Sequence, residues 1–147
     1  MKITSVVLLL CIISLTVTGQ PGAATAEVRA VITAFEAALE MKDLEGLGKL
    51  VSPDIVVFEN GYRNNGCQDF RDHHLIPEFK QPAGHYTSSI VMLEVRSDMA
   101  WAYSRMDRAQ ATNRPQQPDV WSMYVLRRGS AGWKIVALNW SVRRANE

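Results

Sequence analysis

Apolar side chains recur every three or four residues near the start of the chain and every second residue towards its end. From Ala26 to Lys42 the repeat predicts one helix, whose apolar face consists of Val28, Val31, Ile32, Phe35, Ala38 and Leu39. Asp43 is placed to cap a second short helix through Leu50. Residues 55–59 read as a strand, and Asn60-Gly61 predicts a turn.

The second half of the chain predicts a sheet. A segment from Gln68 to Phe79 still has helical spacing, and Pro77 predicts a kink or break in it. Four strand-like segments follow, at 86–95, 100–111, 120–127 and 133–143. Helices first and a run of strands afterwards indicate a single α+β domain.

The two faces of this sheet are expected to differ. Alternation places Trp101, Tyr103 and Arg105 on one face and small side chains, such as those of Ala102 and Ser104, on the other. One face should pack on the helices, and the other should meet water or a second subunit. We expect four polar or aromatic sheet residues to point inward into a pocket: Tyr103, Arg105, Trp121 and Asn139.

The N-terminus predicts an export signal. Lys2 precedes an apolar run from Val6 to Val17, which is short for a membrane span, and small residues follow it. Ala24-Thr25-Ala26 fits a cleavage site, and cleavage after Gly19 is the alternative. Residues 1–26 are therefore expected to be removed, leaving residues 27–147 as one secreted or periplasmic domain without a membrane anchor. An uncleaved anchor is the competing interpretation.

The net charge argues against nucleic acid as a partner, and the cysteine content argues against an internal disulfide. The net charge is +1 and falls close to zero without Lys2, and no basic cluster is present, so nucleic acid is not expected as a partner. Cys67 is the single cysteine outside the predicted signal, so no internal disulfide is expected. Cys67 fits a small buried side chain, with a catalytic thiol as the alternative.

Candidate acid–base residues cluster between residues 59 and 74. Glu59 ends the predicted strand, and the adjacent pair His73-His74 lies on the following helical segment. One interpretation pairs Glu59 with one histidine for proton transfer. The other leaves Glu59 solvated, with one histidine bonded to a loop and the other exposed.

A metal site is a third interpretation, in which His85 or Glu94 would complete a ligand set with Glu59 and a histidine. Adjacent helical residues point about 100° apart, so His73 and His74 do not share one face. The residues therefore predict no metal and no cofactor.

Two sequence blocks carry a resemblance to a known superfamily. AFEAALEMKDLEGLGKLVSPDIVVFENG resembles the helix–helix–strand opening of the nuclear transport factor 2-like superfamily, which includes SnoaL-like and ketosteroid isomerase-like domains, and GWKIVALNWSV resembles its closing strand. The resemblance spans Glu27 to Arg143. It implies a cone-shaped α+β fold, the cystatin-like roll, in which a curved antiparallel sheet wraps around N-terminal helices.

The resemblance also implies roles for individual residues. Glu59 matches the general base of ketosteroid isomerases, whereas Phe35 replaces their oxyanion-binding tyrosine and Tyr124 matches their protonated acid. The pocket would be lined by Phe35, Phe58, Phe70, Tyr103, Arg105, Trp121, Tyr124 and Asn139.

Two function classes follow from these roles. The first is proton transfer on a small apolar molecule by Glu59 with His73 or His74, in an isomerase, cyclase or dehydratase. The second is a non-catalytic small-molecule-binding or accessory domain. The resemblance also implies a homodimer formed through the outer face of the sheet.

Overall fold

The computed structural model describes residues 21–81, 86–108 and 120–142. Helix α1 (Pro21–Glu40) and helix α2 (Leu44–Leu50) come first, followed by strands β1 (Val51–Glu59) and β2 (Tyr62–Asn65). One helical stretch comes next, and four long strands complete the fold. The helical stretch consists of α3 (Cys67–Phe70), the π-helix η1 (Arg71–Leu75) and α4 (Ile76–Phe79); the strands are β3 (Tyr86–Arg96), β4 (Met99–Arg108), β5 (Val120–Gly129) and β6 (Gly132–Val142).

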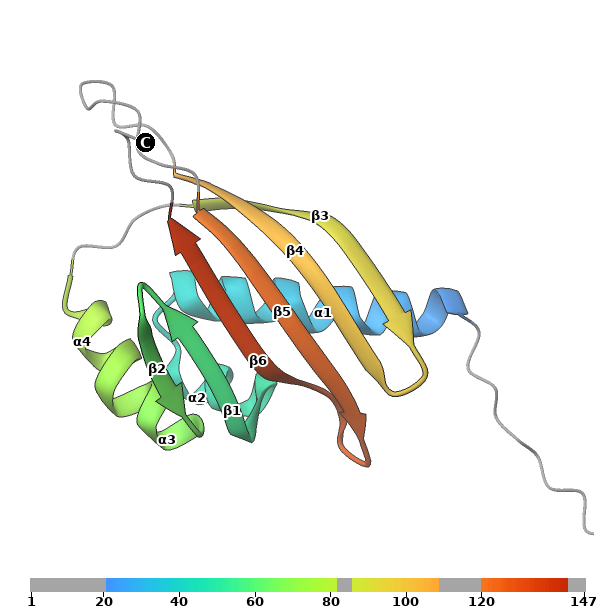
Figure 1. The fold of residues 1–147 in the computed structure, drawn as a ribbon, viewed down its shortest axis with the longest axis horizontal. Coiled ribbons are helices and arrows are strands. Elements are labelled where there is room, and N and C mark those ends of the chain that lie inside the picture. The colour runs from blue at the N-terminus through green and yellow to red at the C-terminus, as the bar shows by residue number, and fades with distance from the viewer. Residues whose placement is uncertain (1–20, 82–85, 109–119, 143–147) are drawn as a thin grey trace, which may run out of the picture.

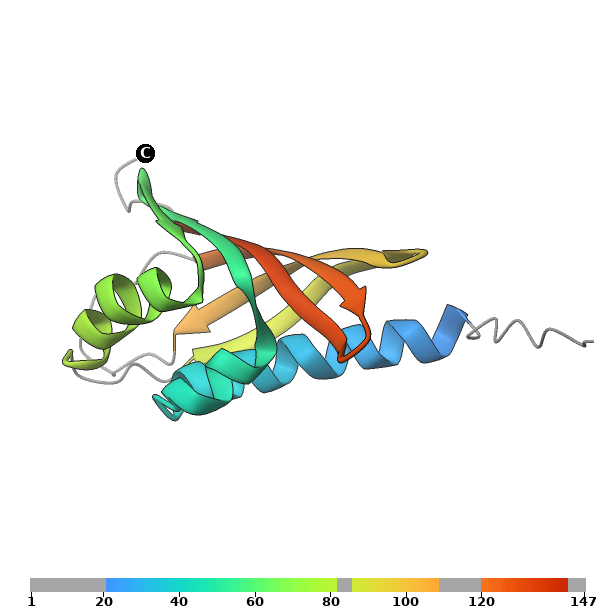
Figure 2. The same cartoon turned by 90° about the horizontal axis from the view of Figure 1, so that it is seen from below.

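The strands form one curved sheet in the order β2-β1-β6-β5-β4-β3. Neighbouring strands run antiparallel except for β1 and β6, which pair in parallel and join the first half of the chain to its last strand. Helix α1 crosses behind the sheet, and the stretch from α3 to α4 closes one end (Figures 1 and 2). The predicted α+β cone, a curved sheet around helices, is confirmed.

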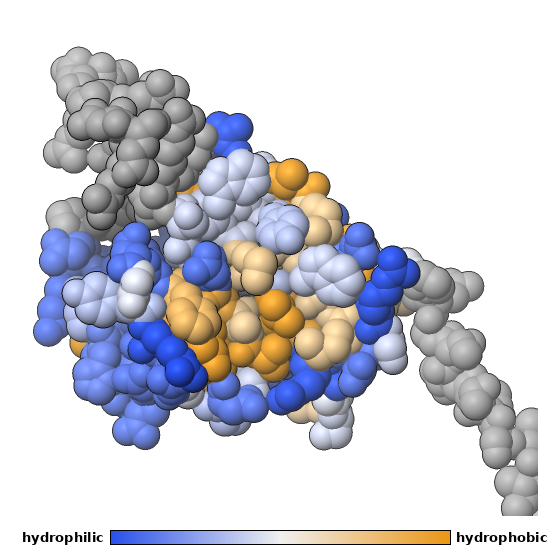
Figure 3. All heavy atoms as spheres, in the orientation of Figure 1, coloured by the Kyte–Doolittle hydropathy of each residue, from blue (hydrophilic) through white to orange (hydrophobic). Residues whose placement is uncertain are grey.

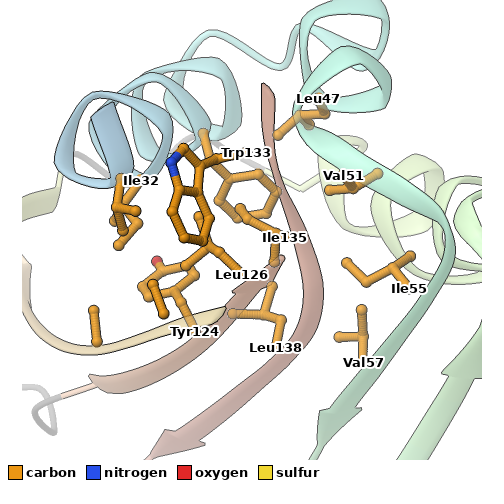
Figure 4. Close-up of a cluster of buried hydrophobic side chains, with 14 of the residues drawn as sticks. Ile32, Leu47, Val51, Ile55, Val57, Tyr124, Leu126, Trp133, Ile135 and Leu138 are labelled. Carbon is orange, nitrogen blue, oxygen red and sulfur yellow. The ribbon is translucent and has the colours of Figure 1, made fainter. Parts of the chain in front are cut away.

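The core lies between α1 and the inner face of the sheet, the face that packs on α1. Ile32 and Phe35 of α1 are fully buried, as the helical repeat predicted, and they face β5 and β6. Figure 4 shows Ile32 on one side of this cluster and the sheet residues on the other, among them Tyr124, Leu126, Ile135 and Leu138. Each fully buried side chain of this size contributes about 1.5–3 kcal/mol through removal of apolar surface from water.

Local signals explain several element boundaries. Asp43 caps α2, since its Oδ1 accepts a hydrogen bond of 2.9 Å from the Gly46 amide. Asn60 and Gly61 both have positive φ, at 49° and 84°, which fits the tight hairpin that joins β1 to β2. Residues 62–65, whose sequence Tyr-Arg-Asn-Asn is polar and gives no strand signal, nevertheless form the edge strand β2, which pairs only with β1.

The helical stretch runs on through Pro77 rather than ending there. The π-turn precedes the proline, and the Ile76 amide donates to Arg71, five residues back. A proline in a regular helix clashes with the carbonyl four residues earlier. The wider π-turn accommodates Pro77, and the helix continues to Phe79.

The predicted signal segment lies mostly outside the described residues, which begin at Pro21. Helix α1 starts there, so cleavage after Ala26 would remove its first six residues, including the buried Ala24, whereas cleavage after Gly19 would leave it intact. Within the described ranges, no helix combines the length and apolar character needed to cross a membrane.

Candidate functional site

Glu59 reaches the inner side of the sheet by simple alternation along β1. Ile55 and Val57 are fully buried on that side, and Glu59 is the next residue in the same series. The register pairs Glu59 with Trp140 of β6, whose indole is 7% exposed. A carboxylate therefore stands at the end of an apolar strand face, beside a buried indole.

His74 is brought to Glu59 by the π-helical stretch. Its Nε2 lies 3.0 Å from Glu59 Oε2, and its side chain is 12% exposed. The imidazole contacts the rings of Phe70 and Trp140, with centroids 5.3 and 5.4 Å away. Both rings pack on His74, whereas Glu59 keeps 26% of its side chain exposed, so the carboxylate is the more accessible member of the pair.

A second carboxylate, that of Glu78, stands near the same nitrogen. Glu78 Oε2 lies 3.6 Å from His74 Nε2, at i,i+4 spacing, and its side chain is 58% exposed. Partial burial raises the pKa of Glu78 above its usual value, and the neighbouring Glu59 raises it further, while His74 opposes the shift. Two carboxylates thus flank the same nitrogen of one imidazole.

The other ring nitrogen of His74 is also occupied. Nδ1 lies 3.1 Å from the Oδ1 atom of Asn64, a buried residue of β2. Asn64 was not predicted to take part, because β2 had no strand signal. Glu78 was also missed, although its four-residue spacing from His74 was visible in the sequence.

His73 has a different environment from that of its neighbour. Its side chain is 76% exposed, and its Nδ1 contacts Asp69 Oδ1 at 2.7 Å. The pKa of Asp69 lies below its usual value, first because the Asn65 amide donates to it and then because of the hydrogen bond with His73. The structure thus brings Glu59 and His74 together and leaves His73 on the surface.

Three predicted pocket residues are buried inside the cone: Phe35, Phe70 and Tyr124. Phe35 packs edge-on against Tyr124, and it stacks on Trp140 with ring centroids 6.4 Å apart. The Tyr124 hydroxyl donates to Glu36 Oε1 at 3.0 Å, and the same oxygen accepts from Ser88 at 2.7 Å. Burial first, and then the charge of Glu36, raise the pKa of Tyr124 well above its usual value.

The other predicted pocket residues lie on the outer face of the sheet. They were expected to point inward, so this prediction is wrong. Phe58, Tyr103 and Trp121 are 45%, 40% and 42% exposed, Arg105 is exposed, and Asn139 is half-buried, donating to the Phe58 carbonyl at 3.3 Å. Ala100, Ala102 and Ser104 take the inner positions of β4 instead. The alanines of β4 therefore belong to the core, and its large side chains face outward.

Of the two residues proposed to complete a metal site, the structure describes only Glu94, which is engaged elsewhere. Glu94 lies exposed on β3 and pairs with Arg96 at 3.2 Å, and His85 lies outside the described residues. Over the described part of the chain, no three histidine, cysteine or acidic side chains are grouped as metal ligands.

Cys67 lies apart from the acid–base pair. It is half-buried and lines a mainly apolar depression of about 250 Å³ between α2, the start of β1 and the helical stretch. The lining residues are Leu44, Glu45, Leu47, Gly48, Val51, Cys67, Phe70, Arg71 and Leu75. The depression contains no histidine, which fits the interpretation of Cys67 as a small packing residue.

Solved structures share this fold at low sequence identity. A proposed dehydratase of the nuclear transport factor 2-like family from Streptomyces avermitilis aligns with a TM-score of 0.73 at 19% identity, covering 86% of this chain and all (100%) of that one. A proposed ketosteroid isomerase from Shewanella frigidimarina gives 0.69 at 19%, covering 80% and 97%. A cystatin-like domain of unknown function from Nostoc punctiforme gives 0.72 at 16%, covering 86% and 82%.

The sequence comparisons agree with the fold. No curated protein matches the chain in sequence. The family model of the SnoaL-like domain matches residues 28–144, nearly the whole of the described fold. The chain therefore belongs to the SnoaL-like domain family, within the nuclear transport factor 2-like superfamily.

Proposed function

We propose that this protein catalyses proton transfer on a small apolar molecule, with Glu59 as the base and His74 as its partner. The observation that carries the proposal is the 3.0 Å contact between Glu59 Oε2 and His74 Nε2, beside the buried ring of Trp140. A carboxylate held against an imidazole can take a proton from one substrate atom and return it to another. Isomerases, cyclases and dehydratases all require such a step.

The roles of the two residues follow from their exposure. Glu59 is the more accessible of the pair and uses one oxygen for His74, so its other oxygen is left to meet the substrate. His74 is enclosed by Phe70 and Trp140, so it holds the carboxylate in place and shares a proton with it. His73, exposed and turned to Asp69, has no part in this step.

A non-catalytic binding function is the second candidate, and one observation favours it. Tyr124, which matches the acid of ketosteroid isomerases, is fully buried and donates its hydroxyl to Glu36 rather than towards a ligand. Phe35 has no hydroxyl to offer. Among these matched positions, the donor that would stabilise a developing oxyanion is therefore missing.

We further propose that the protein works after export, in the periplasm or outside the cell. Lys2, the apolar run from Val6 to Val17 and the small residues that follow support this. A reporter fused after residue 26 and assayed in cell fractions would test it.

The catalytic proposal is tested by hydrogen–deuterium exchange into a panel of small apolar ketones and enones in D2O, followed by proton NMR. Exchange at the carbon next to the carbonyl reports proton abstraction even when no product accumulates. Glu59→Gln keeps the size of the side chain but removes the base, so we expect exchange to fall about 100-fold or more. His73→Gln, the matched control, should exchange at the wild-type rate.

Two outcomes would overturn the catalytic proposal. Unchanged exchange in Glu59→Gln would show that the base lies elsewhere. A compound that binds without exchange, and with equal affinity to wild type and Glu59→Gln, would establish the binding function instead. Both variants should keep the wild-type melting temperature within a few degrees, since Glu59 and His73 are not part of the core.

A further inference from the structure

We propose that Glu78 is the acid of this site: its carboxyl group gives a proton to the carbonyl oxygen of the substrate while Glu59 takes a proton from the neighbouring carbon. The inference rests on the proposed function and adds to it a second catalytic residue and a substrate class, small compounds with a carbonyl group. It also supplies the donor to a developing oxyanion that Phe35 and Tyr124 do not provide.

Glu59 and Glu78 meet at one atom of His74. The Nε2 nitrogen lies 3.0 Å from Glu59 Oε2 and 3.6 Å from Glu78 Oε2, so the two carboxylate oxygens cannot be further apart than these distances together. A hydrogen bond to oxygen and a reactive approach to carbon each span about 3 Å. The two carboxyl groups are therefore close enough to contact neighbouring atoms of one small molecule.

The backbone that carries Glu78 is held in place at both ends of α4. Glu78 lies four residues after His74, in the helix that continues from the π-turn. Beyond it, the Lys42 ammonium group donates to the carbonyls of Phe79 at 2.7 Å and Gln81 at 2.8 Å, which ties α4 to the turn between α1 and α2. The side chain of Glu78 is 58% exposed and can change rotamer to meet a substrate.

The surroundings of Glu78 suit it to the role of the acid. Partial burial, and then the charge of Glu59, raise the pKa of Glu78, while His74 lowers it. Among the described residues, Glu59 and His74 are the titratable groups that act on it. A substrate seated on its exposed part would exclude water and raise the pKa further. Where two neighbouring carboxyl groups differ in this way, the group with the raised pKa holds the proton and serves as the acid.

The step balances without a further reactant. The C–H bond next to the carbonyl breaks, its proton passes to Glu59, and its electron pair forms the C=C bond of an enol. The π pair of the C=O bond takes the proton of Glu78, which becomes a carboxylate. Reversing both transfers, at the same carbon or at another, restores both residues and completes an exchange or an isomerisation.

The first test needs no substrate. Carbon NMR of the protein labelled at its glutamate carboxyl carbons follows each side chain as the pH changes, and Glu78 should titrate above the ordinary glutamate value of about 4.3. Glu59→Gln removes the neighbouring charge and should move the Glu78 midpoint to lower pH. Glu45→Gln, the same change at a glutamate of α2 that pairs with Lys49, should leave it unchanged. A Glu78 midpoint at or below about 4.3 overturns the inference, whatever the activity.

The second test is the exchange of deuterium into small ketones. Glu78→Gln keeps the size of the side chain but cannot give up a proton as an acid, so exchange should fall about 100-fold. Wild-type exchange should also fall as the pH rises and Glu78 loses its proton, and the variant should lack this fall. Glu45→Gln should exchange at the wild-type rate. Normal exchange in a folded Glu78→Gln variant overturns the inference.

Failure of the inference differs visibly from failure of the proposed function. If Glu59→Gln stops exchange and Glu78→Gln does not, the catalytic proposal stands and the role of Glu78 is wrong. If Glu78→Gln slows exchange and Glu59→Gln does not, Glu78 is the acid and the base lies elsewhere. If no ketone exchanges with the wild type, the proposed function fails, and the role of Glu78 fails with it even where its titration is as expected.

Discussion

The two faces of the sheet carry similar aromatic side chains in opposite circumstances. Tyr124 and Trp140 on the inner face are 0% and 7% exposed, whereas Tyr103 and Trp121 on the outer face are 40% and 42% exposed. Figure 3 looks onto the outer face and shows an apolar area at its centre, with polar side chains along its lower and left edges. Aromatic content therefore does not say which face is the core. The core face is identified by its packing against helix α1.

The largest difference between the two faces is expected in how much a substitution on each face lowers the free energy of unfolding. Phe35→Ala leaves a cavity under the rings of Tyr124 and Trp140, and we expect the free energy of unfolding to fall by about 3–5 kcal/mol. Tyr103→Ala on the outer face should change it by less than about 1 kcal/mol in the monomer. Urea denaturation of both variants measures this, and equal losses would mean that the two faces are not different.

A smaller effect is expected on the outer face, where we propose that a second copy of the chain binds. Phe58, Trp121, Met123 and Val91 are each at least 40% exposed there, an apolar surface that a lone subunit leaves in water. Trp121→Ser should weaken self-association by about 2 kcal/mol without lowering monomer stability. Tyr62→Ser, which changes an exposed tyrosine of β2, is the control. A wild-type protein that sediments as a monomer at micromolar concentration would contradict the proposal.

The smallest effect is expected at Asp69 of α3, which accepts the Asn65 amide of the edge strand β2 and keeps 34% of its side chain exposed. Its folded pKa is lowered, so its stabilising contribution is present above the unfolded pKa of about 3.9 and is lost as pH falls through the lower folded value. Asp69→Asn lacks this contribution. The difference in urea midpoint between wild type and Asp69→Asn should therefore shrink below about pH 4. A difference that stays constant on acidification would show that the carboxylate charge does not matter.

Sequence patterns predicted the parts of the fold that depend on neighbours along the chain. The apolar repeat through Ile32 and Phe35, the Asp43 cap and the Asn60-Gly61 turn all depend on short spacings, and all are present. The pairing of Glu59 with a histidine was one of three interpretations of the cluster between residues 59 and 74, and spacing along the chain did not choose among them.

Other features depend on contacts between distant segments, which spacing cannot reveal. The inward or outward direction of Trp121 is set by which face α1 covers, and shifting a strand by one residue exchanges the two faces. Asn64 gains its position only because β2 pairs with β1 and meets His74. The choice between His73 and His74 was also open, because a π-turn changes the angular spacing of side chains along the helix.

The parallel pairing of β1 with β6 has a consequence for the timing of synthesis. Glu59 receives its neighbour Trp140 from the last strand, and Asn139 reaches back 81 residues to the Phe58 carbonyl. A chain still on the ribosome, with β6 unmade, holds Glu59 and His74 without the indole that walls them in. Such long-range pairings form late in folding because a long loop must close first. We therefore expect the surroundings of Glu59 and His74 to be complete only when the final strand has docked.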